Sequence, residues 1–519
     1  MKETSHSQSW GETISAFCHP RVVAMLFLGI SAGVPLLLIF SSLSLWLREA
    51  GVERAAVTYF SWAALGYSFK FVWAPLIDKL PIPVLTNLLG RRRAWLLLSQ
   101  LMIMLAISTM ALIDPNENTL TAMAWAAVFL GFSSATQDVV IDAYRIESAD
   151  SNLQTLMSSS YIAGYRIGML LAGAGALFLA SYFGSTMDNY SYQAWQWTYL
   201  LMASVMLIGV VTTLIVAEPT IQSDNNSLVN KQNHLGFLLL FALSVAGFIS
   251  CFYYSSGYVQ TVKSHLTFFI SNSLLSGFLV ELCRLVLALA ISSVIAKFIV
   301  LSGLVQKQMV EQTYIAPIKD FFHRYGKSLA WLLLALIGLY RISDIVLGVI
   351  SNVFYQDLGF TKPEIASVVK TFGLLMTIAG GFLGGLLAIR FGVMRILFLG
   401  ALLSALTNLL FMLLAQAGHD MVMLYIVISA DNLSAGLASA AFIAFLSSLT
   451  NISFTAVQYA IFSSLMTLLP KIIGGYSGTL VETLGYQQFF LITALMGIPV
   501  LILILWAGKH FQLNAKLKV

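Results

Sequence analysis

The chain has 519 residues, of which 58% are hydrophobic and only 10% are charged. A soluble domain carries about 25% charged residues, and a mean hydropathy of +0.85 leaves too little polar surface to cover a water-soluble globule of this length. The composition therefore excludes a set of soluble domains and predicts one large membrane protein. The net charge of +5 is small, and we expect no nucleic-acid partner. Three widely spaced cysteines predict neither a disulfide framework nor a metal site.

Apolar runs long enough to cross a membrane recur along the whole chain. A bilayer core about 30 Å thick needs about 20 apolar residues per helix. Fourteen runs meet this requirement, at 22–46, 55–79, 94–113, 120–143, 155–183, 194–217, 236–259, 268–301, 329–355, 363–389, 393–416, 421–449, 453–480 and 485–508. We expect an all-α polytopic membrane protein with an N-terminal six-helix bundle (1–217), linkers with two inserted helices (218–328) and a C-terminal six-helix bundle (329–519).

The positive charges in the loops predict the orientation of the spans, because cytoplasmic loops carry an excess of Lys and Arg. If both termini are cytoplasmic, 17 of the 28 Lys and Arg residues fall in cytoplasmic segments, four in outer loops and seven within spans. This excess predicts cytoplasmic termini. An even number of spans, which puts both termini on the same side of the membrane, agrees with this orientation.

Ionisable side chains within spans mark candidate sites, since inserting each one into a bilayer costs about 2.5–3.5 kcal/mol. Asp138 and Asp142 lie four residues apart in the fourth span, on one face of a helix. Two neighbouring carboxylates cannot both ionise cheaply when desolvated, so one of them is expected to hold a proton. The pair is the candidate site for proton coupling. The alternative for Asp142 is a simple ion pair with Arg145 at the cytoplasmic end.

Further charged residues lie deep in spans of both halves. Arg341 and Asp344 are three residues apart and share a helical face, so they either contact cargo or neutralise each other as a buried pair. The deep groups have a modest surplus of positive charge, which suits a cargo with carboxylates. The charged candidates for cargo binding are Lys70, Arg166, Arg341, Asp344, Lys370 and Asp431.

The two six-helix halves repeat one another, and internal repeats are typical of secondary transporters. After the second span of the first half, residues 74–79 read APLIDK and residues 90–93 read GRRR; residues 385–392 of the second half read GLLAIRFG. Both segments resemble the cytoplasmic loop signature of the major facilitator superfamily. The loop after Asp78 is longer than in that pattern, and Ile389 replaces the acid in the second half.

The same segments predict a gate. An acid at a helix end can pair with bases across the cytoplasmic side and release them when the halves move, so we expect Asp78, Arg91, Arg92 and Arg390 to act in gating. The alternative is that the arginines only anchor the topology. In the fifth span, the four-residue spacing of Gly164 and Gly168 predicts close helix packing, with a hinge as the alternative.

Several segments together resemble the AmpG family of muropeptide permeases. They are YSFKFVWAPLID (67–78), GRRR (90–93), SATQDVVIDAY (134–144), GYRIGML (164–170), VKTFGLL (369–375), DNL (431–433) and FTAVQYA (454–460). The likeness covers nearly the whole chain and is weakest in the middle pair of helices. The acetyl-coenzyme A carriers share a similar segment around Lys70.

The resemblance implies a proton-driven permease of a Gram-negative inner membrane, monomeric in the lipid bilayer and without a cofactor other than the proton gradient. Its cargo would be N-acetylglucosaminyl-1,6-anhydro-N-acetylmuramyl peptides, taken from periplasm to cytoplasm for wall recycling and for induction of a β-lactamase. The stem carboxylates would meet Lys70, Arg166 and Lys370. The sugar rings and acetamido groups would meet Gln137, Tyr165, Asn432, Gln458 and Tyr459.

Three other functions are weighed against this one. Another anionic cargo, such as acyl-coenzyme A or peptides, is the nearest alternative. A membrane enzyme is disfavoured, because the sequence lacks a His-Glu-x-x-His zinc motif, and Gly326-Lys327-Ser328 has Phe321 where a phosphate loop needs its first glycine. A receptor or scaffold has no need for carboxylates and lysines deep in both halves.

Overall fold

The computed structural model describes residues 16–52, 67, 69–116, 119–186, 189–219, 231–270, 273–305, 307–361, 364–474 and 477–517. Every regular element in these residues is a helix, as the composition predicts. Contacts along the chain group Met1–Ile221 with Phe321–Val519 in one compact unit, and place Gln222–Asp320 in a second.

The first half of the larger unit is built from helices that cross it several times, some of them in two pieces. Pro35 lies inside α2 and removes a backbone donor, and the helix ends at Ile39 before the chain continues as α3. The elements are η1 (Ala16–Cys18), α2 (Pro20–Ile39), α3 (Ser41–Glu49), η3 (Lys70–Val72), α6 (Ala74–Lys79), α7 (Leu85–Leu89), α8 (Arg91–Ala111), α9 (Leu120–Ser148), α10 (Ser151–Leu170), η4 (Leu171–Gly175), α11 (Ala176–Tyr182), α12 (Tyr192–Val205) and α13 (Leu207–Ile215).

The second half repeats this pattern of long helices with local breaks. Its first helix is kinked at Gly326, where φ is +71°, a value that suits glycine because it has no Cβ. The elements are α18 (Ala316–Leu339), α19 (Ile342–Asp357), η7 (Ile365–Phe372), α21 (Gly373–Phe391), α22 (Val393–Ala417), α23 (Met421–Leu449), η8 (Ile452–Phe454), α24 (Thr455–Gly474), α25 (Ser477–Leu484), α26 (Tyr486–Leu495) and α27 (Gly497–Leu517).

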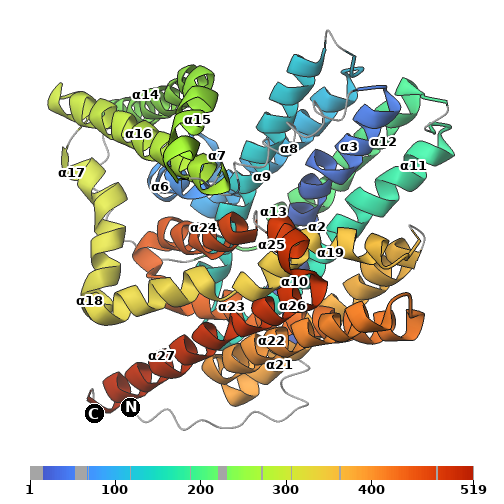
Figure 1. The fold of residues 1–519 in the computed structure, drawn as a ribbon. Coiled ribbons are helices and arrows are strands. Elements are labelled where there is room, and N and C mark those ends of the chain that lie inside the picture. The colour runs from blue at the N-terminus through green and yellow to red at the C-terminus, as the bar shows by residue number, and fades with distance from the viewer. Residues whose placement is uncertain are drawn as a thin grey trace. The chain divides into compact units, whose positions relative to one another are not determined.

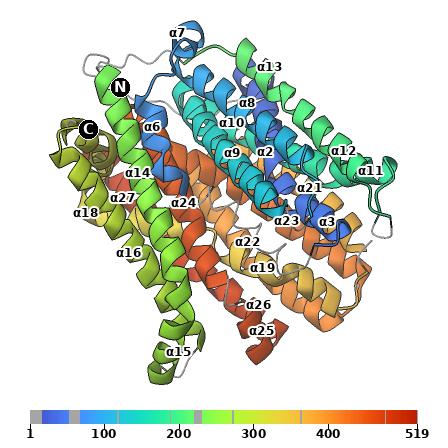
Figure 2. The same ribbon diagram turned by 90° about the horizontal axis from the view of Figure 1, so that it is seen from above.

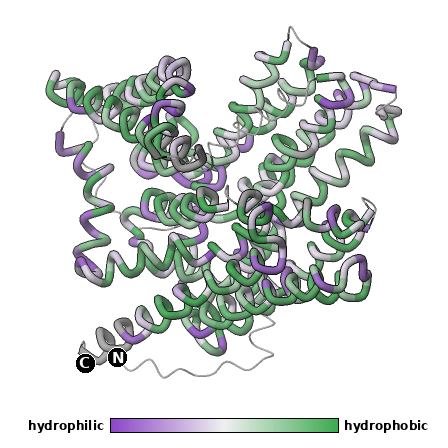
Figure 3. The backbone as a smooth tube through the Cα atoms, in the orientation of Figure 1, coloured by the Kyte–Doolittle hydropathy of each residue, from purple (hydrophilic) through white to green (hydrophobic). Residues whose placement is uncertain are grey.

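Twelve helices in the described part of the chain are long and apolar enough to span a membrane, and hydrophobic residues predominate along their length (Figure 3). Two of the fourteen expected runs are not among them. Most of the 55–79 run lies outside the described residues, and within α16 (Ser273–Leu301) only Val286–Leu301 counts as a shorter apolar helix. The count of fourteen is therefore not confirmed.

The smaller unit has its own helix packing. It contains α14 (Lys231–Ser255), η5 (Ser256–Tyr258), α15 (Val259–Ile270), α16, α17 (Lys307–Val310) and η6 (Glu311–Ile315). Helices α14 and α15 both pack against α16.

Each half of the larger unit has a separate hydrophobic core. One core joins residues of α2, α3, α8, α9 and α12, including Trp46 and Trp195, whose rings stack with centroids 5.7 Å apart. The other joins residues of α18 to α27, including Phe354, Phe411 and Phe490, together with Ile146 of α9. Each half thus has its own main hydrophobic cluster within the larger unit.

The two halves meet through a few helices. Helix α10 packs against α21 and α23, and α9 packs against α24. Figure 1 shows the first half in blue to green-cyan and the helices α21 to α27 in orange to red, and Figure 2 shows the same helices from above. The contacts described below lie where α9 ends and α10 begins, a region we call the α9/α10 end.

Candidate functional site

The guanidinium of Arg92 is the centre of a buried ion network at the α9/α10 end. Its Nη2 lies 2.7 Å from Asp78 Oδ1, its Nε donates to Glu147 Oε2 at 2.8 Å, and Nη2 also pairs with Glu147 Oε1. The side chains of Arg92 and Glu147 are each 1% exposed. Because charges removed from water need partners, two carboxylates around one guanidinium hold these helix ends together.

The network crosses from the first half to the second. Asp78 Oδ1 and Oδ2 accept from the backbone amides of Ala456 and Val457 at 3.3 and 3.1 Å. These amides belong to the first turn of α24, where helix N–H groups lack partners within the helix and favour negative charge. Thr455 also contacts both Arg92, at 2.8 Å, and Glu147. The charge group at Asp78 therefore ties the two bundles together.

Two further residues support this arrangement. Arg91 donates to the carbonyl oxygen of Asp78 at 2.8 Å and lies 3.8 Å from Glu147. Glu218 accepts from the backbone amides of Arg92 and Arg93 at 2.8 and 3.0 Å. A carboxylate at a helix N-terminus satisfies orphan donors and complements the helix dipole, so Glu218 fixes the start of α8.

A second group of charged residues lies about one turn further from the end of α9 than Glu147. Asp142 pairs with Lys70 Nζ at 3.8 Å and with Arg145 Nη2 at 3.2 Å. Arg145 reaches the second half, where its Nη1 donates to Ser447 at 2.6 Å and its guanidinium lies 5.2 Å from the centroid of the Tyr459 ring. Asp142 thus has the Arg145 partner that the alternative interpretation gives it, and Lys70 as well.

Asp138 differs from Asp142 in having no ion pair among the described residues, and its neighbour Gln137 is only partly hydrogen-bonded. Asp138 is 8% exposed and accepts from the Tyr161 hydroxyl at 3.4 Å. Gln137 is fully buried, and its Oε1 accepts from Ser31 at 3.2 Å, while its Nε2 has no partner among the described residues. The carboxyl of Asp138 is therefore the one of the two in α9 that is free of an ion pair in the described structure.

Polar groups continue from Asp138 toward the second half. The Tyr161 and Tyr165 rings have centroids 6.0 Å apart, and Tyr165 interacts electrostatically with Asp138 and with Arg166. Arg166 in turn interacts with Arg341, which lies just before α19 in the other half. The structure brings together residues that the sequence placed in different spans.

In the second half, Arg341 Nε lies 3.0 Å from Asp344 Oδ2, and its Nη1 donates to Ser439 of α23. Asp431, also on α23, accepts from Thr407 at 3.4 Å. Arg341 and Asp344 therefore form the ion pair that is one of their two expected arrangements, and Asp431 interacts electrostatically with both members.

The remaining predicted residues have different environments. Asn432 accepts from Thr377 at 2.9 Å. Gln458 Oε1 accepts from Arg324 at 3.0 Å and from the backbone amide of Asn451 at 2.8 Å, and Gln458 is 1% exposed. Gln458 therefore joins Arg324 to the segment between α23 and α24 within the second half.

Two predicted cations lie apart from these groups. Lys370, in the π-helical segment η7, is exposed and has no acidic partner in the described residues. Arg390 lies near the end of α21, with its guanidinium 5.9 Å from the Phe391 ring centroid.

Sequence reasoning missed Glu147, Thr455 and Ser447. The signal for Glu147 was present, since it is an acid five residues beyond Asp142 at the end of the same helix. The two hydroxyl residues carry no such signal, because serines and threonines are common in membrane helices.

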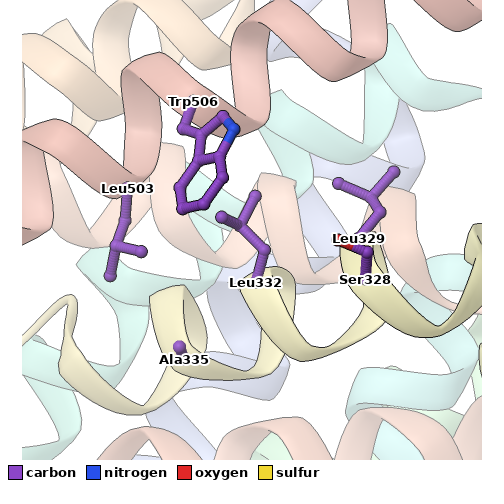
Figure 4. A pocket seen from close by; sticks show the side chains of 6 residues that line it. All are labelled: Ser328, Leu329, Leu332, Ala335, Leu503 and Trp506. Atoms are coloured by element: carbon purple, nitrogen blue, oxygen red, sulfur yellow. The ribbon is translucent and has the colours of Figure 1, made fainter.

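The pocket in Figure 4 lies away from these groups. It is an apolar groove of about 250 Å³ between α18 and α27, lined by Ser328, Leu329, Leu332, Ala335, Leu503 and Trp506. No group of three His, Cys, Asp or Glu side chains suited to a metal occurs in the described residues.

Comparison with known proteins identifies related chains. Residues 22–339 match the model of the Major Facilitator Superfamily. The chain is 30% identical over 96% of its length, and 98% of the relative's, to a transporter of Rickettsia conorii named AmpG 4. It is 28% identical over 94% of its length, and 80% of the relative's, to the anhydromuropeptide permease of Escherichia coli K12.

Solved structures share the fold at low identity. The proton:xylose symporter XylE superposes with a TM-score of 0.56 at 12% identity, over 95% of each chain. The fucose:proton symporter FucP of E. coli gives 0.58 at 11% identity, over 95% of this chain and 99% of the other. The relatives are named as transporters and a permease, which agrees with the expectation that the chain is not an enzyme.

Proposed function

Because the chain belongs to the major facilitator superfamily and, within it, to the AmpG family of transporters, we propose that it carries anhydromuropeptides from periplasm to cytoplasm. The observation that carries this proposal is the match to an anhydromuropeptide permease over 94% of the chain. Polar and charged side chains deep in both halves suit a cargo with sugar rings and carboxylates. The cargo would then enter wall recycling and signal for β-lactamase induction.

The proposed topology has fourteen spans in a bacterial inner membrane, with both termini cytoplasmic. Residues 1–217 and 329–519 form the two bundles, and 218–328 hold the linkers and two inserted helices. The distribution of Lys and Arg supports this orientation, which makes the α9/α10 end cytoplasmic. We take the transporter to act as a monomer, since each chain already contains both halves.

Proton coupling is assigned to Asp138, with Asp142 as its neighbour. A coupling carboxyl must gain and lose a proton during the cycle, and a carboxyl held by two cations resists protonation. Asp142 is held by Lys70 and Arg145, whereas Asp138 has one long hydrogen bond from Tyr161. The surroundings therefore favour Asp138 as the carrier of the proton.

Gating is assigned to the ion network at the α9/α10 end. Asp78, Arg92 and Glu147 hold α24 of the second half against the first half. Release of this network would open the cytoplasmic side. Arg91 supports it from α8, and Arg390 lies at the end of α21.

Cargo binding is assigned to polar residues that lie beyond the two groups of charged residues, toward the periplasmic end of the helices. Tyr165 and Asn432 offer an aromatic face and an amide for sugar and acetamido groups. Arg166, Arg341 and Lys370 offer positive charge for carboxylates. Lys70, Asp344 and Asp431 would adjust the charge of the site, and Gln137 and Tyr459 would line its cytoplasmic limit.

Uptake into right-side-out membrane vesicles tests this function. Radiolabelled N-acetylglucosaminyl-1,6-anhydro-N-acetylmuramyl tripeptide should accumulate when a proton gradient is imposed, and a protonophore should abolish the accumulation. Unlabelled disaccharide peptide should compete for uptake.

A different anionic cargo is the second candidate, since Lys370, which has no acidic partner among the described residues, would attract any carboxylate or phosphate. Competition by acyl-coenzyme A or by plain peptides, without accumulation of the labelled muropeptide, would favour that candidate. The exposed Arg395 gives a matched control, because Arg395→Gln removes a positive charge from outside the assigned site.

A further inference from the structure

Arg166 of α10 has an environment unusual for a cation within a membrane helix. Its guanidinium contacts the sulfur of Met169 at 3.8 Å and forms no ion pair with any described acid. The residue is half-buried. A desolvated cation without a counter-charge is costly, so an anion that neutralises Arg166 during the cycle would be favoured there.

The packing of α10 on α21 places Arg166 at the level of the second half's polar residues. A Cβ on Gly385 would lie 2.0 Å from the Ser159 hydroxyl, and a Cβ on Gly381 would lie 3.7 Å from Ile162 Cγ2. The two helices are thus antiparallel, and each step of about one turn up α10 corresponds to one turn down α21. One further turn brings Arg166 to the level of Thr377.

Arg341 lies at nearly the same level on the other side. Thr377 of α21 packs against Gly436 of α23, and Ser439, about one turn further along α23, accepts from Arg341. The Arg341 side chain is 20% exposed, and its Nε lies 3.0 Å from Asp344 Oδ2. The electrostatic repulsion between Arg166 and Arg341 agrees with this placement.

From this geometry we infer that Arg166 and Arg341, one from each half, form a single site for a carboxylate of the cargo, and that the carboxylate relieves their mutual repulsion. A carboxylate has two oxygens, and each can accept from one guanidinium fork. This inference rests on the proposed function, because the cargo that supplies the carboxylate is the stem peptide of the muropeptide.

The other deep cations fit this role less well. Lys70 and Arg145 are already paired with Asp142, so a carboxylate there would have to compete with a resident one. Lys370 has no acidic partner in the described structure, but no cation from the other half is described beside it. Arg166 and Arg341 are the pair through which one anion would contact both bundles.

Binding of two matched ligands to the purified protein tests the site. The ligands are the anhydro-disaccharide tripeptide and its analogue with every stem carboxylate converted to a carboxamide. The native protein should prefer the carboxylate form by about 10- to 100-fold, the ratio expected for one or two charge-assisted hydrogen bonds. Arg166→Gln should remove most of this preference by weakening binding of the carboxylate form alone, and Arg166→Lys should keep part of it.

The controls separate this inference from the proposed function. Arg395→Gln should keep the full carboxylate preference. If native protein and Arg166→Gln bind the tripeptide equally, or if Arg166→Gln weakens both ligands equally, the arginine site is wrong while muropeptide transport stands. If the native protein binds neither ligand, the proposed cargo is wrong. The distance measurement described next then tests the arginine site without any cargo.

A distance measurement without cargo tests the repulsion. Spin labels are attached at Leu112→Cys and Val422→Cys, two exposed positions on the first and second halves, after Cys18, Cys251 and Cys283 are changed to Ser. Arg166→Gln should shift the distance distribution toward shorter values, because one repelling charge is gone. An unchanged distribution in Arg166→Gln would overturn the paired site whatever the cargo is.

Discussion

At the scale of single residues, two carboxylates of the same helix differ in their partners. Asp138 and Asp142 are one turn apart in α9 and both less than 10% exposed. Asp142 is neutralised by Lys70 and Arg145, and Asp138 is not paired with a cation in the described structure. The two carboxyls are equally buried, but only Asp142 has cations that stabilise its charged form. They are therefore suited to different roles.

We predict that Asp138→Asn lowers gradient-driven accumulation far more than it weakens muropeptide binding. The amide keeps the shape of the side chain and can no longer exchange a proton. Accumulation in vesicles should fall by about 100-fold or more, the lower end of the effect of a lost proton-transfer group, while the dissociation constant changes less than threefold (~0.6 kcal/mol). Accumulation that persists unchanged across pH in Asp138→Asn would show that coupling lies elsewhere.

We predict that Arg92→Gln destabilises the transporter strongly. It leaves Asp78 and Glu147 buried without their shared cation, and breaking a buried ion pair by removing one partner costs about 3–5 kcal/mol. The midpoint of thermal inactivation in detergent, followed by size-exclusion chromatography, should fall clearly below that of the native protein. Arg395→Gln, which removes an exposed charge, should leave the midpoint unchanged.

Glu147→Gln gives a graded test of the same network. It keeps the pair of Arg92 with Asp78 at 2.7 Å, so its midpoint should lie between those of the native protein and Arg92→Gln. A midpoint for Arg92→Gln equal to that of the native protein would mean that the network contributes no net stability.

Local spacing in the sequence was enough to predict pairs within one helix. Arg341 with Asp344 and Arg145 with Asp142 are each three residues apart, and in both cases the structure shows the ion pair that was the alternative to a role in cargo binding or proton coupling. Partners from different helices could not be predicted, because they depend on how the helices pack. Glu147 reaches Arg92 across 55 residues of chain, and Gln458 accepts a hydrogen bond from Arg324.

At the scale of elements, the packing of α2 against α10 depends on glycine. A Cβ on Gly164 would lie 2.0 Å from the carbonyl oxygen of Leu26, and one on Gly168 would lie 2.2 Å from that of Ile30. Real Cβ atoms do not approach backbone oxygens so closely, so the two helix backbones touch only because these side chains are absent. The spacing in the sequence predicted this packing, but not that α2 is the partner.

We predict that Gly164→Ala reduces the amount of folded transporter. The added methyl group must push α2 away from α10, and overpacking of this kind costs about 1–3 kcal/mol. Gly348→Ala in α19 is the matched control, because a Cβ there meets no atom within 4 Å. The yield of monodisperse protein should fall in Gly164→Ala and stay near the native value in Gly348→Ala; equal yields would contradict the close approach.

The sequence also predicted most of the membrane helices, because runs of about 20 apolar residues are a strong signal. It did not predict where helices break, such as at Phe40 between α2 and α3 or in the π-helical segment of α10–α11. Such breaks depend on how neighbouring helices satisfy freed backbone groups.

At the scale of the whole transporter, the two halves, each with its own main hydrophobic cluster, are joined through contacts at the α9/α10 end and along α10. These contacts combine ion pairs, hydrogen bonds to the start of α24, and the close approach of α10 to α21. Ion pairs and hydrogen bonds can be exchanged for water more easily than an apolar interface of the same area. A polar junction is therefore suited to opening and closing during transport.

We predict that a disulfide across this junction stops transport reversibly. Ile162 Cγ2 lies 3.7 Å from the position of a Cβ on Gly381. The Cβ of residue 162 is one bond away from that carbon, so the Cβ atoms of Ile162→Cys and Gly381→Cys lie within one bond length of this distance, a range that includes the roughly 3.5–4.5 Å of a disulfide. In a background without Cys18, Cys251 and Cys283, mild oxidation should cross-link the halves and abolish uptake, and a reductant should restore it. Each single cysteine variant should keep transporting after oxidation.

Cargo together with a proton gradient should slow cross-linking, because the junction is then open for part of each cycle. Native uptake by the cross-linked protein would mean that the two halves need not separate at this junction.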